Sequence, residues 1–210
     1  MDVSTTGAHE PDQRLPLVQR KQRAAQRRAQ AVAFRLLETA PFDAITIELI
    51  AAGAEVSPSS IYRYFGTKEA IFLWDEYDDD VVGRFRQNLA TSPPGQAMLD
   101  AVTGAMPSLD LYGSTAVLTR ARAVAAVPQL RAARANHHER LRHSLGSAMV
   151  EHGWPDAVSS TFAGAVIGAF TGALAAWERP GSDSDLTAAL ARAAEFVKHL
   201  DRAATQRHSG

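Results

Sequence analysis

The feature that most constrains this chain is a helix that stops and restarts over a very short distance. Between Val56 and Phe72 the sequence reads VSPSSIYRYFGTKEAIF, which contains two helix-start signals. Ser57 followed by proline is the first, because a serine hydroxyl can accept an early backbone N–H and proline tolerates the first helical position. Thr67 followed by a Lys-Glu pair is the second. The helix between the two signals must therefore be very short.

The short helix, over 58–65, is expected to present one apolar and one polar surface. Ile61 and Phe65 lie four residues apart, so both should face inward. The outer surface is then rich in hydrogen-bonding and basic groups, as expected of a surface that meets phosphates and base edges: Ser59, Ser60, Tyr62, Arg63 and Tyr64.

Two further helices are predicted before it. Between Arg20 and Thr39, apolar residues recur at helical spacing while arginines crowd the first half. Pro41 ends this helix, and Thr46 can cap the next one, over Ile47–Ala54. The residues Glu-Val-Ser join that helix to the one over 58–65. The sequence therefore predicts a helix-turn-helix.

The remainder is also expected to be helical. Thr67 should cap a longer helix that runs from Lys68 to about Ala90. Proline and glycine clusters divide the rest of the chain, and no alternating run of β-branched residues indicates a strand. The predicted fold is all-α with about nine helices, the later ones near 96–105, 114–126, 129–152, 156–178 and 184–205.

Three parts are expected along the chain: a disordered tail (1–18), the helix-turn-helix domain (19–66) and a second helical domain (67–210). Their charges differ in sign. From Arg14 to Lys68 nine basic side chains face four acidic ones, whereas from Glu69 to Asp110 eight acidic side chains face two basic ones. A basic end joined to an acidic body predicts a polyanionic partner at one end only.

Several functional classes are disfavoured by the sequence. The absence of cysteine excludes disulfides and a cysteine nucleophile, and it is consistent with a reducing compartment. No apolar run follows a basic start at the N-terminus, so a cytoplasmic location is expected. There is no nucleophile elbow, phosphate-binding glycine loop or zinc-protease spacing, so an enzyme is not expected and no cofactor is predicted.

The run FDAITIELIAAGAEVSPSSIYRYFGTKEAIF, Phe42 to Phe72, resembles the DNA-binding region of the tetracycline-repressor (TetR) family of bacterial transcription regulators. The segments LWDEYDDDVVGRF and VPQLRAARANHHERL resemble an actinobacterial branch that includes mycofactocin-associated regulators. The resemblance implies a ligand-responsive repressor that binds a palindromic DNA operator as a homodimer and is released by a small-molecule effector. A DNA-binding dimer without an effector is the alternative.

Two positions depart from the family pattern. Glu55, in the turn, and Pro41, after the first helix, stand where the family commonly has glycine. If Glu55 adopts a left-handed conformation, the strain is about 1 kcal/mol.

The resemblance and the polarity of the surface together assign candidate DNA contacts. Hydroxyls at helix N-termini suit phosphate oxygens, the short helix is placed to reach the major groove, and the flanking basic residues suit the backbone. A solvated helix surface is the alternative for each residue. The candidates are Arg28, Thr46, Ser57, Pro58, Ser59, Ser60, Tyr62, Arg63, Tyr64 and Lys68.

The middle helices are expected, by resemblance, to enclose an effector pocket for an apolar or acyl-bearing molecule. Simple core packing is the alternative for each residue. The candidate lining residues are Trp74, Tyr77, Met98, Met106, Tyr112, Leu118, His137 and Met149. The acidic run 75–80 and the histidines near His137 could suggest a metal site, but consecutive helical residues point in different directions, so no metal site is predicted.

A helix near 156–178 carries Gly164, Gly168 and Gly172 on one face, which allows another helix to approach closely. A membrane helix pair is the alternative, although the apolar run is only about long enough to span. By resemblance, this helix and the last one form the dimer interface, with Trp177 at its end.

Overall fold

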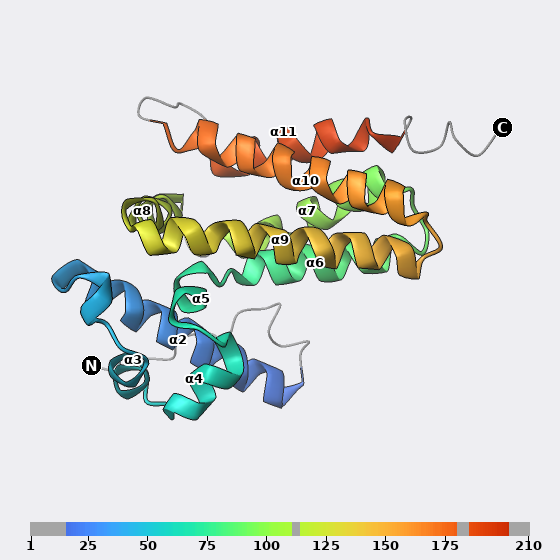
Figure 1. Cartoon of the computed structure of the whole chain (residues 1–210). Helices are drawn as coiled ribbons and strands as arrows, with labels where there is room; N and C mark the ends of the chain where they lie inside the picture. The colour runs from blue at the N-terminus through green and yellow to red at the C-terminus, as the bar shows by residue number, and fades with distance from the viewer. Residues whose placement is uncertain (1–15, 111–113, 180–184, 202–210) are drawn as a thin grey trace, which may run out of the picture. The chain divides into compact units, whose positions relative to one another are not determined.

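The computed structural model describes residues 16–110, 114–179 and 185–201, and within them the chain is helical without strands (Figure 1). The all-α prediction is confirmed. The described part contains ten α-helices rather than about nine. The contacts divide the chain into two units, Met1–Trp74 and Asp75–Gly210.

Unit 1 contains four α-helices and one short 3-10 helix: α2 (Leu17–Thr39), η1 (Phe42–Ala44), α3 (Ile47–Gly53), α4 (Pro58–Phe65) and α5 (Lys68–Leu73). The apolar stripe of α2 is buried against α3, α4 and α5. The approach of α3 is tight at Gly53, where an added Cβ would lie 2.8 Å from Cγ1 of Val32. A larger residue at position 53 would therefore have to displace the Val32 side chain.

The three helix starts predicted in this unit are confirmed. The hydroxyls of Thr46, Ser57 and Thr67 each accept a backbone N–H three residues later, at 3.2 Å. Each bond satisfies one of the N–H groups that a helix start leaves without an intrahelical partner. The first helix begins at Leu17, three residues before the predicted start, and it ends at Thr39 as predicted.

The predicted continuous helix from Lys68 to about Ala90 is wrong. The backbone turns extended at Trp74 (φ −63°, ψ 128°), so α5 ends at Leu73 and α6 begins at Glu76. The carboxylate of Asp75 accepts the N–H of Tyr77 at 2.9 Å and caps the new helix.

A side chain from α2 satisfies the end of α5. The Gln30 amide Nε2 donates to the carbonyl oxygens of Ile71, at 3.0 Å, and Trp74, at 2.6 Å. Because α5 also packs on α2 and α4, it belongs to unit 1, and the division of the chain falls after Trp74 rather than after residue 66. Gln30 thus holds the helix break in place from a distant part of the sequence.

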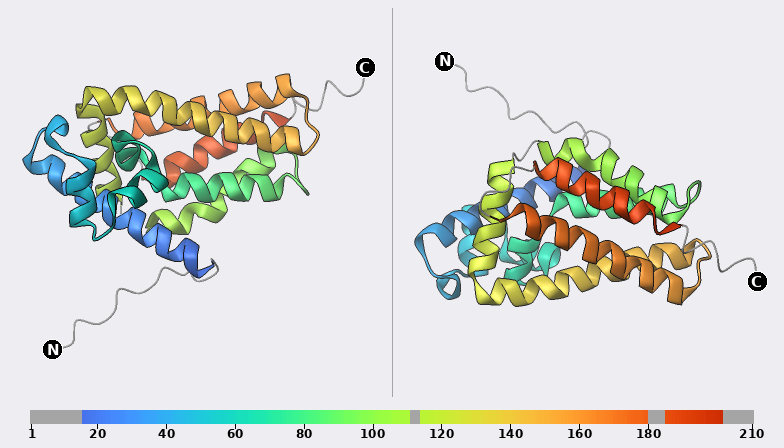
Figure 2. Two further views of the ribbon diagram at one scale, coloured as in Figure 1. Left: turned by 60° about the horizontal axis from the view of Figure 1, so that its bottom comes forward. Right: turned by 90° about the horizontal axis from the view of Figure 1, so that it is seen from above.

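Unit 2 contains six helices: α6 (Glu76–Asn88), α7 (Pro94–Asp110), α8 (Ser114–Ala126), α9 (Pro128–Glu151), α10 (Asp156–Trp177) and α11 (Leu186–Lys198). Helices α9 and α10 run beside each other, and α11 packs on both α10 and α7 (Figure 2). The start of α7 is capped by Asp201, whose carboxylate oxygens accept the N–H groups of Gly95, at 2.6 Å, and Gln96, at 3.0 Å.

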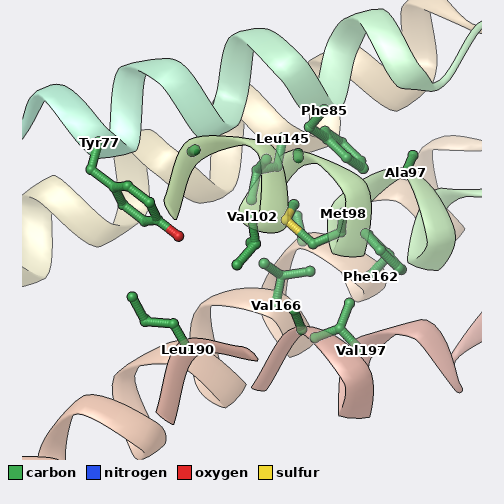
Figure 3. Close-up of a cluster of buried hydrophobic side chains, with 14 of the residues drawn as sticks. Tyr77, Phe85, Ala97, Met98, Val102, Leu145, Phe162, Val166, Leu190 and Val197 are labelled. Carbon is green, nitrogen blue, oxygen red and sulfur yellow. The ribbon is translucent and has the colours of Figure 1, made fainter. Parts of the chain in front are cut away.

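The core of unit 2 is an apolar cluster drawn from α6, α7, α9, α10 and α11 (Figure 3). Within it, the rings of Phe85 and Phe162 stack with their centroids 6.0 Å apart. Met98 and Met149 are fully buried in the same cluster. The cluster joins helices from both ends of the unit's sequence, so it defines one folded body.

Gln30→Leu should destabilise the protein by about 1–3 kcal/mol, because it leaves two carbonyls at the end of α5 without their donor. Gln26→Leu is the matched control: Gln26 lies one turn earlier on α2 and is equally exposed, at 6% for both residues, but it makes no such bond to α5. Urea unfolding of both variants measures the difference. Equal losses would show that the hydrogen bonds of Gln30 contribute nothing.

Candidate nucleic-acid interface

Helix α4 is anchored by one side and presents the other to solvent. Ile61 is 1% exposed, and Phe65 packs edge-on against Trp74 with ring centroids 6.2 Å apart. Tyr62, on the outer side, is 52% exposed. The inward and outward faces predicted for this helix are therefore confirmed.

Three serine hydroxyls cluster at the N-terminus of α4. The Ser57 Oγ lies 2.9 Å from both the Ser59 Oγ and the Ser60 Oγ, in addition to accepting the Ser60 N–H. Hydroxyls and backbone N–H groups at a helix start suit an anionic oxygen such as that of a phosphate. Pro58 at the first helical position sets the direction of this end.

Further along α4, Arg63 and Tyr64 form an ordered pair. The Arg63 Nη2 donates to the Tyr64 hydroxyl at 3.1 Å, and the Arg63 Cζ lies 5.0 Å from the centre of the Tyr64 ring. Stacking on a ring restricts a guanidinium before it meets a partner. Arg63 is consequently held near the serines and Tyr62 on one helix.

The turn between α3 and α4 contains a left-handed residue. Glu55 has φ 56° and is, among the described residues, the single non-glycine with a positive φ. Its side chain is exposed. Glu55 thus adopts the left-handed conformation that the sequence left as one possibility, and the turn keeps the shape that a glycine would adopt more easily.

Arg28 supports the same turn from α2. Its Nε donates to the Ala54 carbonyl at 3.1 Å, while the residue as a whole remains exposed. A guanidinium has four further N–H donors, so this bond is compatible with a phosphate contact. Thr46, at the start of α3, is exposed as predicted. Pro41 is extended and precedes η1, a position that proline tolerates.

Lys68 differs from its predicted role. Its Nζ donates to the carbonyl oxygens of Phe42, at 2.8 Å, and Ile45, at 2.9 Å, and lies 3.9 Å from the centre of the Phe42 ring. The ammonium is thus engaged within the protein, joining α5 to the segment before α3. In this structure Lys68 positions the helix-turn-helix rather than presenting a charge for a phosphate.

The sequence did not single out two features of this unit. Gln30 lies on the inward side of α2, where a polar residue at an apolar position was the available signal. Leu49 is an exposed apolar residue on α3, at 51%. The one signal for Leu49 in the sequence is that an apolar residue stands on the polar side of an amphipathic helix.

The predicted effector residues fall into four groups. Tyr77, Met98 and Met149 are buried in the cluster of unit 2, with Met106 and Leu118 packed at its edge. Trp74 belongs to unit 1, where it packs against Phe65, and its place in an effector pocket stays a prediction. His137, on α9, pairs with Asp78 of α6 and its side chain is 18% exposed, and Tyr112 lies outside the described residues.

Unit 2 also contains a group of acidic and histidine side chains on α6 and α9. The His137 Nε2 lies 3.0 Å from the Asp78 Oδ2. Burial, with the nearby Asp78 carboxylate, raises the pKa of Asp75 to about 6. Burial, with the neighbouring His137 and Arg134, lowers the pKa of His138. Across the described residues, no three His, Asp or Glu side chains are grouped to hold a metal ion.

The glycine-bearing face of α10 is open. A Cβ added at Gly164, Gly168 or Gly172 would meet nothing within 4 Å. Helix α10 is the one helix in the described residues that is long and apolar enough to span a membrane, yet only 22% of its most apolar stretch is buried. Trp177 differs from the glycines, because it is 7% exposed and already packs in the core of its own chain.

An open cleft of about 250 Å³ lies between α10 and α11. The cleft is lined by alanines together with Trp177, Arg192 and Phe196. Phe196 is one of the exposed large apolar residues. The cleft therefore continues the apolar surface of these two helices and is separate from the predicted effector residues, none of which lines it.

Comparisons with known proteins agree with this geometry. Residues 31–73 match the model of the bacterial regulatory proteins of the tetR family, and residues 92–200, more than half of the chain, match the MftR C-terminal domain. The comparison with curated proteins found no match. A solved structure described as a TetR-family transcriptional regulator, from Mesorhizobium loti, is 19% identical, with a TM-score of 0.51, over 90% of this chain and 98% of that one; it shows the same fold. The chain belongs to the TetR family of bacterial transcriptional regulators, in the branch with an MftR-type C-terminal domain.

Proposed function

We propose that this regulator is a cytoplasmic repressor that binds a palindromic operator as a homodimer and releases it when a small-molecule effector binds. The observation that carries the proposal is the exposed side of α4. Tyr62 lies on it, beside the serine cluster at the helix start and the ordered Arg63. No chemical step is required, because operator release follows from binding alone.

The proposed reading of DNA divides the contacts by chemistry. Ser57, Thr46 and the outer part of Arg28 are assigned to phosphates, which fix the register of the protein on the duplex. Ser59, Tyr62 and Arg63 are assigned to base edges in the major groove. Lys68 acts indirectly, by fixing the segment before α3 against α5.

Dimerisation through α10 and α11 is supported by the open glycine face and the exposed Phe196. A short recognition helix reads few base pairs, so a second copy related by a two-fold axis is needed for a long site. A membrane-spanning pair is the rival use of α10. The cleft beside α11 favours the soluble dimer, because its lining includes the charged Arg192.

Tyr62→Ala should reduce affinity for the selected operator by about 5- to 150-fold, because a good base contact contributes about 1–3 kcal/mol. Random duplex should be much less affected. Leu49→Ala is the control, since Leu49 is similarly exposed but lies on α3. Titrations of duplexes selected from a random pool by the wild-type protein measure both. Proportional losses on operator and random DNA would remove Tyr62 from base reading.

Gly168→Leu should convert the dimer to a monomer, because a leucine on the open face of α10 would hold the second helix away. Operator binding should then weaken by about 100-fold or more, as the second half-site is lost. Gly83→Leu is the matched control: Gly83 is also a helical glycine with open space around it, but it lies on α6. Sedimentation of the two variants decides. A Gly168→Leu dimer would place the interface elsewhere.

Effector binding should change the fluorescence of Trp74, because this residue joins α5 to α6 and packs on Phe65 of α4. Replacing Trp154 and Trp177 by phenylalanine isolates its signal. A ligand that shifts the signal should lower operator affinity by about 5- to 150-fold, and operator should weaken the ligand by the same factor. A saturating ligand that leaves operator affinity unchanged would contradict the effector part of the proposal.

A further inference from the structure

Tyr77 carries a buried polar atom that has no partner among the described residues. The residue is 7% exposed, and its phenol oxygen makes no hydrogen bond to that part of the chain. Leaving such a group unsatisfied costs about 1–3 kcal/mol, and native proteins keep few of them. Phenylalanine would fill nearly the same volume without that cost. The hydroxyl therefore requires an explanation other than packing.

The hydroxyl is directed into the apolar cluster rather than toward solvent. Figure 3 shows it pointing from α6 toward the side of the cluster where Val102 of α7 and Leu190 of α11 lie. Met98 and Met149 belong to the same cluster. Methionine side chains are unbranched and flexible, so a cluster that contains them can repack around a guest.

The surroundings of Tyr77 keep its hydroxyl protonated. Burial, followed by the carboxylates of Asp78, Asp75 and Asp80, raises the pKa of the phenol above its ordinary value. At neutral pH the group is therefore a hydrogen-bond donor. The charged groups that raise this pKa are three carboxylates, which disfavours an anionic ligand group beside the hydroxyl, although Arg120 and His137 act on Asp75 in the same part of the unit.

We propose that the Tyr77 hydroxyl is the hydrogen-bonding group of the effector site and that the site takes a largely apolar molecule with one neutral acceptor, such as a carbonyl. This assignment rests on the proposed effector function and adds the ligand class. A neutral group suits the site better than an ammonium, because moving a charge into an apolar cluster is far more costly.

The position of Tyr77 also connects the site with DNA binding. It is the second residue of α6 and follows Trp74 and Asp75, the two residues at which the chain leaves the DNA-binding unit. Its own N–H is held by the Asp75 carboxylate at 2.9 Å. A ligand that pulls on the Tyr77 hydroxyl therefore acts on the capped start of α6, next to the junction.

The test uses three probes with the same chain and different ends: 2-decanone, decanoate and decylammonium. Calorimetric titration of the full-length protein should show binding of 2-decanone in preference to both ions. Tyr77→Phe should weaken 2-decanone by about 3- to 10-fold, the loss of one neutral hydrogen bond. The same variant should melt about 2–4 °C higher, because an unsatisfied group has been removed.

Tyr62→Phe is the control for the ligand titrations and the melting measurements alone, because it removes an exposed phenol from α4 and should change neither; it is left out of the operator titrations, since Tyr62 is assigned to DNA. Equal 2-decanone affinity in wild type and Tyr77→Phe, preference for either ion, or no binding of any probe would overturn the assignment. Operator titrations separate the two proposals. Tyr77-dependent binding without operator release contradicts the effector function alone, whereas release that persists in Tyr77→Phe at unchanged affinity contradicts only the role of Tyr77.

Discussion

The DNA-binding unit depends on a short helix, α5, that is tied at its start by its own Lys68 and at its end by Gln30 of α2. Helix α5 has six residues, too few for a helix to be stable in water by itself. Lys68 ties its start to the carbonyls of Phe42 and Ile45, and Gln30 ties its end to those of Ile71 and Trp74. Because α5 directly follows α4, these four hydrogen bonds also fix the frame from which α4 presents its polar side.

Unit 2 has more apolar surface on α10 than its own core buries. Its core packs α6, α7, α9, α10 and α11 closely, yet α10 keeps most of its most apolar stretch out of that core. Small residues on an open face let another helix approach closely. A second copy of the chain is the proposed occupant, and the two-fold symmetry that it would create suits a palindromic DNA site.

Features set by neighbouring residues could be predicted from the sequence, whereas features set by distant contacts could not. The caps at Thr46, Ser57 and Thr67 are local hydrogen bonds within one turn, and all three were predicted. The helix break at Trp74 was missed, because the amide that satisfies its carbonyls comes from Gln30 on another helix.

The candidate site follows the same division. Exposure of Tyr62 follows from the period of α4 once Ile61 faces the core, so it could be predicted. The sequence around Lys68 contains no partner for its ammonium group, so a DNA contact was predicted. Its hydrogen-bond acceptors lie more than twenty residues away, where the sequence pattern could not indicate them. Trp177 was placed at an interface because it ends the helix assigned to that interface, although the core of its own chain buries it.

The central claim is that two copies of α4 read one DNA site with two-fold symmetry. Hydroxyl-radical footprinting of the selected duplex, together with the mass of the complex, tests it most directly. The account predicts two protected segments related by symmetry, centred a whole number of helical turns of about 34–36 Å apart, with both occupied by one dimer. A single asymmetric protected segment bound by one copy of the chain would contradict it.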